Sequence, residues 1–131
     1  MTFPYVNLLD GSSMPVIPVT LGRGDRYVVT EALIDSGSAN GIFDAQFAKA
    51  LGISSLHSGT KRIFEGISGH RIAGYQHSVN LIVGGKRIPH VMIAFSEDMP
   101  DNSVNILGQQ GFFELFPITF NYRKKEITIA L

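Results

Sequence analysis

Glycine recurs at short intervals along the chain and separates short apolar runs from one another. The 131 residues include 14 glycines, spread from the first fifth of the chain to its last fifth. Glycine is a residue of turns, and short apolar runs between turns are typical of strands. This pattern predicts an all-β fold with many turns.

Three pairs of apolar runs predict β-hairpins. The paired ranges are 14–21 with 27–34, 79–83 with 88–95, and 118–122 with 127–131. A glycine-rich or polar turn separates the two runs of each pair. In the last pair, apolar residues recur with a period of two, which is the period of a strand with one buried face. The turn of the first pair contains Arg23-Gly24-Asp25, which is interpreted as a hairpin turn and not as an adhesion motif.

Two short helices are predicted between the strands. Asp44 can cap the first free amides of a helix, and Gly52 suits the residue that ends it. The second helix is predicted over residues 109–116, and Pro117 stops it.

Length and charge limit the class of protein. A chain of this length buries about two-thirds of its surface, so residues 1–131 are predicted to form one domain. Basic and acidic residues number 11 each, which argues against nucleic acid or an anionic membrane as a partner. Because there is no cysteine, a disulfide scaffold, a thiolate zinc site and a cysteine nucleophile are excluded. No apolar run would span a bilayer and no secretory signal is visible, so a cytoplasmic location is expected.

The segment 32–38 places a carboxylate at the end of an apolar strand. Burying Asp35 there is costly unless its side chain is hydrogen-bonded or used in chemistry. Ser36 adds a hydroxyl, and Gly37 lets the backbone approach whatever lies opposite. A simpler interpretation is that Asp35 only caps the amides of a turn. Residues 104–108 weakly repeat the order of strand, glycine and helix, which suggests a pseudo-symmetric lobe.

These segments together resemble the retropepsin-like aspartic proteases. Ile34-Asp35-Ser36-Gly37-Ser38 is similar to the family's active-site signature, a hydrophobic residue followed by Asp, Thr or Ser, Gly, and Ala or Ser. Ile106-Leu107-Gly108, with Gly111-Phe112-Phe113 after it, is similar to the family's Ile-Leu-Gly segment. Gly66-Ile67-Ser68-Gly69 stands where the family has its glycine-rich flap tip. The resemblance covers roughly residues 14–130.

The resemblance implies an all-β acid-protease lobe, a closed and barrel-like fold with a flap hairpin and two short helices. Asp35 would be the catalytic residue, supported by the loop residues Ser36, Gly37 and Ser38. Glu65, Gly66, Ile67, Ser68 and Gly69 would form the flap, and Ile106, Leu107 and Gly108 the second glycine loop. The family hydrolyses peptide bonds with a water molecule activated by two carboxylates that share one proton. No metal and no organic cofactor are implied.

The active-site signature occurs only once in the chain, around Asp35, so the second carboxylate is expected from a second copy of the chain in a homodimer. Asp10 lacks the required order of residues after it, and Asp98 and Asp101 lie in a polar loop. The expected partners are therefore a peptide or protein substrate and a second copy of the chain. The alternating segment 126–131 would supply either an interface strand or an intramolecular one.

Two positions depart from the retroviral pattern, in which an acid and an arginine pair with each other. Ala39 and Gln109 stand there and both are neutral, so neither leaves a charge unpaired.

Two other functions stay open. One is a non-catalytic retropepsin-like module for dimerisation or peptide binding, and the other is an unrelated β-barrel that binds a small ligand. The four histidines are scattered without metal-ligand spacing, so they are interpreted as surface or strand residues.

Overall fold

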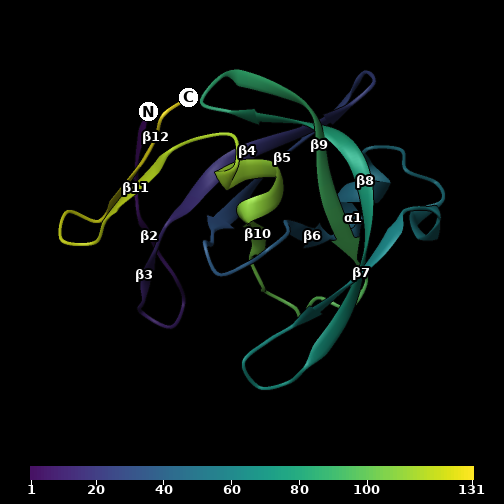
Figure 1. Cartoon of the computed structure of the whole chain (residues 1–131), viewed down its shortest axis with the longest axis horizontal. Coiled ribbons are helices and arrows are strands. Elements are labelled where there is room, and N and C mark those ends of the chain that lie inside the picture. The colour runs from purple at the N-terminus through teal and green to yellow at the C-terminus, as the bar shows by residue number, and fades with distance from the viewer.

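The computed structural model describes all 131 residues, and strands dominate it (Figure 1). The strands are β1 (Thr2–Pro4), β2 (Val6–Asn7), β3 (Ser13–Met14), β4 (Val16–Arg23), β5 (Arg26–Ile34), β6 (Ile42–Asp44), β7 (Thr60–Glu65), β8 (Arg71–Val83), β9 (Lys86–Ser96), β10 (Asn105–Leu107), β11 (Ile118–Asn121) and β12 (Glu126–Ile129). The helical elements are α1 (Ala45–Ala50), η1 (Leu56–Ser58) and η2 (Gln109–Phe113). The predicted all-β fold and its three hairpins are confirmed.

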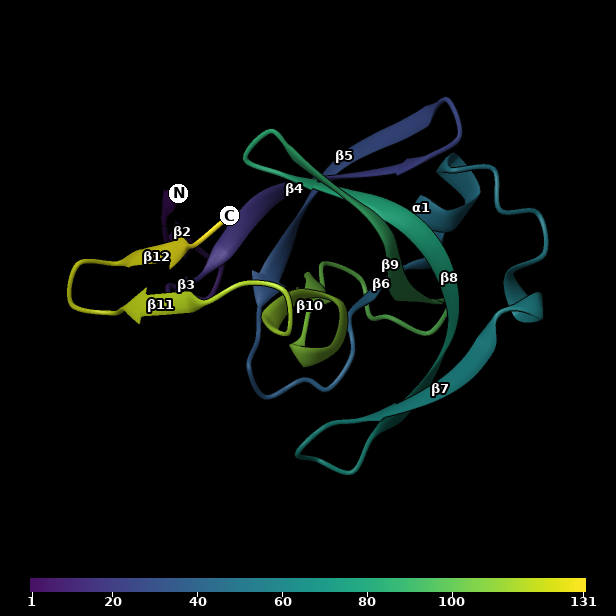
Figure 2. The same cartoon turned by 45° about the horizontal axis from the view of Figure 1, so that its top comes forward.

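Six of these strands close into a ring. Their order is β4-β5-β10-β6-β9-β8, and β8 pairs again with β4, where Leu81 lies opposite Leu21. Alternate residues of each strand point inward, as do the buried Ile17, Val19 and Leu21 of β4. β7 lies outside the ring because it pairs only with β8. Figure 2 shows β7 and the start of β8 as an arm that projects from this body.

The two predicted helices have different outcomes. The first is confirmed, because the Asp44 side chain accepts a hydrogen bond from the Gln46 amide at 2.9 Å and Gly52 follows with φ of +77°. The second is shorter and distorted, since Gln110 is extended and Gly111 has φ of +88° inside η2. The single turn η1 is not predicted by any pattern in the sequence. None of the helices has the length and apolar character that crossing a membrane requires.

The last strand lies in the middle of a separate three-stranded sheet. β12 pairs with β1 on one side and with β11 on the other. The amino group of Met1 donates to the Ile129 carbonyl at 2.7 Å, so both ends of the chain lie together (Figure 1). Of the two roles left open for residues 126–131, the intramolecular one is therefore correct.

The Arg23-Gly24-Asp25 segment is the tight turn between β4 and β5. Gly24 has φ of +61°, which glycine adopts without strain. Arg23 donates through Nη1 to the Gly52 carbonyl at 3.1 Å, just past the end of α1. The guanidinium thus binds the backbone that follows the helix, so the arginine has a structural partner.

Candidate active site

Asp35 follows β5 directly, where that strand pairs in parallel with β10. Ile34 lies opposite Leu107, and the Asp35 amide donates to the Leu107 carbonyl at 3.0 Å. The half-buried carboxylate accepts a hydrogen bond from the Gly37 amide on Oδ1 at 2.9 Å. This contact is the turn cap that the simpler interpretation expects. Oδ2 accepts no hydrogen bond within the chain, so it is free for chemistry.

Backbone hydrogen bonds join the two glycine loops to each other. The Gln109 amide donates to the Ser38 carbonyl at 2.8 Å, and the Gln110 amide donates to the Ala39 carbonyl at 2.9 Å. Ser38 also donates from its hydroxyl to the Asn40 carbonyl at 2.7 Å. The structure thus brings the two segments that the resemblance singles out, 34–38 and 106–108, into one unit.

Gln109 has a role that sequence reasoning misses. Its side-chain amide donates from Nε2 to the Ser36 carbonyl at 2.7 Å. The neutral residue at this position therefore supports the loop that carries Asp35, without an ion pair. The sequence shows only that an arginine is missing there; the contact joins residues 73 positions apart in the chain.

Gly108 lies where no side chain fits. A Cβ built on it would come within 2.4 Å of the Ser38 carbonyl oxygen and 2.9 Å of the Asn40 carbonyl oxygen. Both atoms belong to the backbone of the loop that follows Asp35, so they cannot move aside cheaply. Glycine at position 108 is what allows the two loops to touch.

Replacing Gly108 by alanine is therefore expected to destabilise the fold. Overpacking against backbone costs about 1–3 kcal/mol, which corresponds to a fall in melting temperature of roughly 3–12 °C for a domain of this size. Thermal unfolding followed by circular dichroism measures the change. Gly66→Ala is the matched control, because nothing lies within 4 Å of the Cβ that it adds. Equal melting temperatures for the two variants would contradict this account.

Ser36 and Gly37 are exposed, and Ser38 is half-buried. The Ser36 hydroxyl makes no hydrogen bond within the chain, although its carbonyl accepts one from Gln109. A Cβ on Gly37 would meet only the Asp35 carboxylate, at 3.2 Å. The exposed face of this loop is therefore open to another molecule.

A cleft of about 790 Å³ opens beside Asp35. One wall is residues 37–40 and another is the flap arm, residues 63–68. The loop after β9 supplies Met99 and Pro100 to the lining. Most of the remaining lining is apolar and comes from Ile42, Ile72, Val104 and Ile106, and two polar residues, His70 and Ser103, complete it.

The predicted flap is the tip of the β7–β8 hairpin. The Gly66 amide donates to the His70 carbonyl at 3.0 Å, and the Gly69 amide donates to the Gly66 carbonyl at 2.9 Å. Gly69 has φ of +81°, as a tight turn requires. The side chain of Ile67 is entirely exposed, and Glu65 pairs with Arg71 at 3.5 Å on the surface. The tip therefore has little to hold it against the body.

The other acidic candidates lie outside the cleft lining. Asp10 forms the turn between β2 and β3, where hydrogen bonds from the Ser12 hydroxyl and amide hold the pKa of its carboxyl below the usual range. Asp98 accepts a hydrogen bond from the Ala73 amide at 3.1 Å. Asp101 is exposed and makes no hydrogen bond. Asp35 is the only aspartate in the cleft.

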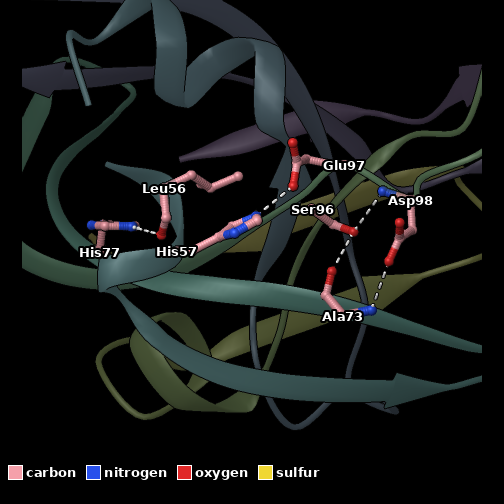
Figure 3. Close-up of polar contacts among 7 residues, drawn as sticks. All are labelled: Leu56, His57, Ala73, His77, Ser96, Glu97 and Asp98. Atoms are coloured by element: carbon pink, nitrogen blue, oxygen red, sulfur yellow. Dashed lines mark hydrogen bonds and ion pairs between the residues drawn. The ribbon is translucent and has the colours of Figure 1, made fainter. Parts of the chain in front are cut away.

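Two of the four histidines, His57 and His77, have side-chain partners, while His70 lines the cleft. His57 pairs with Glu97 at 2.7 Å and stacks on Tyr75, while His77 contacts the Leu56 carbonyl at 2.7 Å (Figure 3). No three side chains of the metal-binding types come together in the structure. These contacts fasten η1 to the strands beside it.

Comparison with known proteins bears on the whole fold. A sequence model of the family described as aspartyl protease matches residues 17–110. Among solved structures, a retropepsin-like aspartic protease from Rickettsia conorii has a TM-score of 0.64 at 15% identity, and the alignment covers 97% of each chain. The EIAV protease complexed with the inhibitor HBY-793 has a TM-score of 0.53 at 18% identity, over 73% of this chain and 82% of its own. At such identities the structures show a shared fold. Among curated proteins, no sequence matches the chain significantly.

Proposed function

Because the chain belongs to the aspartyl protease family, we propose that it is an endopeptidase whose active site contains Asp35 from each chain of a homodimer. The observation that carries this proposal is the position of Asp35. It is the only aspartate in the cleft, it lies on a loop that hydrogen bonds join to residues 107–110, and its Oδ2 accepts no hydrogen bond within the chain. Ser36, Gly37 and Ser38 support that loop, together with Ile106, Leu107 and Gly108.

The chemistry requires two carboxylates that face each other and share one proton. Like charges about 3 Å apart cannot both ionise, so one group stays protonated at working pH. The ionised group accepts a proton from water, and the resulting hydroxide attacks the scissile carbonyl carbon. The protonated group donates to the carbonyl oxygen, which gives a tetrahedral diol. The carboxyl that took the proton from water then passes it to the leaving nitrogen, the diol returns a proton to the other carboxylate, and collapse of the intermediate releases the amine. No covalent intermediate with the enzyme forms.

A second copy supplies what one chain lacks. The exposed Ser36 hydroxyl is free to hydrogen-bond to the opposite loop, and Gly37 lets the two loops approach. The Gly37 amide holds Oδ1, which leaves Oδ2 without a hydrogen-bond partner in the chain and available to the shared proton and the water. The neutral Ala39 and Gln109 put no charge near this contact.

The substrate that suits the cleft is a peptide in extended form. Such a peptide would pair its backbone with the flap and with the loop beneath it, as an added strand does. The flap residues are Glu65, Gly66, Ile67, Ser68 and Gly69. A cytoplasmic location and a single domain over residues 1–131 remain predictions from the sequence.

A non-catalytic peptide-binding module is the second candidate, because the bond from the Gly37 amide gives Asp35 a structural use. A peptide library with mass-spectrometric detection separates the two functions. The proposal expects cleavage with a faster rate at acidic to mildly acidic pH, since only the singly protonated pair works. Binding of peptides without cleavage at any pH from about 4 to 8 would favour the module instead.

The flap tip is expected to become ordered when a peptidomimetic inhibitor binds. Residues 66–69 are all exposed in the free chain, so their amides have little protection, and a bound backbone would pair with them. Amide hydrogen exchange with and without the inhibitor measures the change, with a roughly tenfold or larger slowing at the tip. The β4–β5 turn, Gly24 and Asp25, is the internal control, since it lies outside the cleft lining. Unchanged exchange at the tip under saturating inhibitor would contradict the flap role.

A further inference from the structure

The root of the flap arm has a backbone that no strand pairs on one side. β8 pairs with β9 from Tyr75 onward, where Tyr75 lies opposite Phe95, whereas residues 71–73 pair only with β7. β9 ends at Ser96. On the side facing the body, the peptide groups of Ala73 therefore need partners that are not a strand.

Two side chains take the place of the missing strand. Ser96 donates from its hydroxyl to the Ala73 carbonyl at 2.6 Å, and Asp98 accepts from the Ala73 amide on Oδ2 at 3.1 Å. The Asp98 amide also donates to the Ser96 hydroxyl at 3.1 Å, so the two side chains brace each other. Figure 3 shows these bonds around Ala73. Both main-chain groups of Ala73 are satisfied at this one point.

We propose that Ser96 and Asp98 form a flap clamp, a pair of positioning residues that fixes the root of the arm and so sets how the flap meets the substrate. The inference rests on the proposed function, because it assigns the arm the task of covering a bound peptide. It adds two residues that no sequence motif marks and that make no hydrogen bond to the loop that carries Asp35.

The clamp lies between two walls of the cleft. Ile72 precedes Ala73, Met99 follows Asp98, and both line the cleft. Ser96 is fully buried, so it anchors the clamp to the body of the fold. The distance between the flap wall and the 97–104 loop is therefore set by the bonds at Ala73.

Little else holds the arm beyond this point. The pair between Glu65 and Arg71 is exposed at 3.5 Å, and such pairs contribute little. Arg62 donates to the side chain of Gln76 at 3.0 Å, which ties β7 to β8 and not to the 97–104 loop. Loss of the clamp would free the root of the arm while leaving the Asp35 loop untouched. The expected result is weaker substrate binding with little change in the chemical step.

The test compares Asp98→Ala with Asp101→Ala, an exposed aspartate in the same loop that makes no hydrogen bond. Amide exchange of the free protein is measured first, at Ala73, whose amide donates to Asp98. Losing a bond to a charged acceptor should accelerate exchange in Asp98→Ala by about 5- to 20-fold, and Asp101→Ala should match the wild type. Asp98→Asn keeps an oxygen that can accept from Ala73, so it should restore most of the protection. Ser96→Ala removes the other half of the clamp and should accelerate exchange as well.

Steady-state kinetics on a cleaved peptide then connect the clamp to function. We expect KM to rise about fivefold in Asp98→Ala with kcat within about twofold, and Asp98→Asn to lie near the wild type. Equal exchange in Asp98→Ala and Asp101→Ala would overturn the clamp whatever the activity. Faster exchange with an unchanged KM would overturn its part in substrate binding. If the wild type cleaves no peptide while the exchange pattern is as expected, the protease proposal fails and the clamp stands as a restraint on the arm.

Discussion

Replacing Asp35 by asparagine is expected to lower kcat/KM for peptide hydrolysis by roughly 10³-fold or more, because the change removes both the general base and the general acid from the pair. An amide neither accepts the proton of the attacking water nor donates one to the carbonyl oxygen. The asparagine oxygen can still accept from the Gly37 amide, so the loop should keep its shape. Rates on the best peptide from the library measure the loss.

The control for Asp35→Asn is Asp101→Asn, which makes the same chemical change on an exposed loop. Both variants should unfold within about 2 °C of the wild type, since neither change disturbs packing. Only Asp35→Asn should lose activity. A folded Asp35→Asn protein that retains more than a few per cent of the wild-type rate would remove Asp35 from the catalytic role.

Local signals in the sequence are enough for most of the fold. Each predicted hairpin is joined by a short turn, so its pairing depends on residues close together in the chain. The cap of α1 is equally local, because Asp44 bonds the amide two residues further on. The two glycine loops are also recognisable, since each is a strand end with its glycine in a short segment.

The parts that sequence reasoning misses depend on contacts between distant residues. The second helix is broken at Gln110, where the amide donates to the Ala39 carbonyl of the other loop. Helix propensity depends on local sequence and does not predict this long-range contact. In the sequence, Gln109 shows only that the arginine of the retroviral pattern is absent. The structure adds that its side-chain amide donates a hydrogen bond to the Ser36 carbonyl. Asp98 is an exposed residue of a polar loop, and nothing in the sequence indicates that Ala73 of the flap arm is its partner.

The two walls of the cleft therefore differ in how many hydrogen bonds hold them to the rest of the fold. The Asp35 loop is bound to the 107–110 segment by the Asp35, Gln109 and Gln110 amides and by the Gln109 side chain. The flap arm is hydrogen-bonded to the 97–104 loop at Ala73 alone. A firmly bonded Asp35 loop and a more loosely bonded flap arm suit an enzyme that must hold its carboxylate in place and open to admit a polypeptide.

Activity is expected to depend on the square of protein concentration below the dissociation constant of the dimer. Each chain has one aspartate in the cleft and the proposed mechanism needs two, so in that mechanism a lone chain would lack half of the acid–base pair. At high dilution the fraction of dimer falls in proportion to concentration, and the specific activity falls with it. Analytical ultracentrifugation over the same concentrations, beside the rates, measures both quantities.

Mixing the wild-type chain with Asp35→Asn separates a requirement for the dimer from simple loss of protein on dilution. At concentrations well above the dissociation constant, where nearly all chains are dimeric, about a ninefold excess of Asp35→Asn leaves roughly one wild-type chain in ten paired with another wild-type chain. The activity per wild-type chain should then fall to about one tenth. The same excess of an unrelated protein should leave the rate unchanged, provided that substrate exceeds total protein. The neutral Ala39 and Gln109 remove an ion pair that would strengthen the contact, and β12 has both edges paired within its own chain, so we expect a weak dimer. A rate that stays linear in concentration where ultracentrifugation finds only monomer would mean that Asp35 works without a second copy.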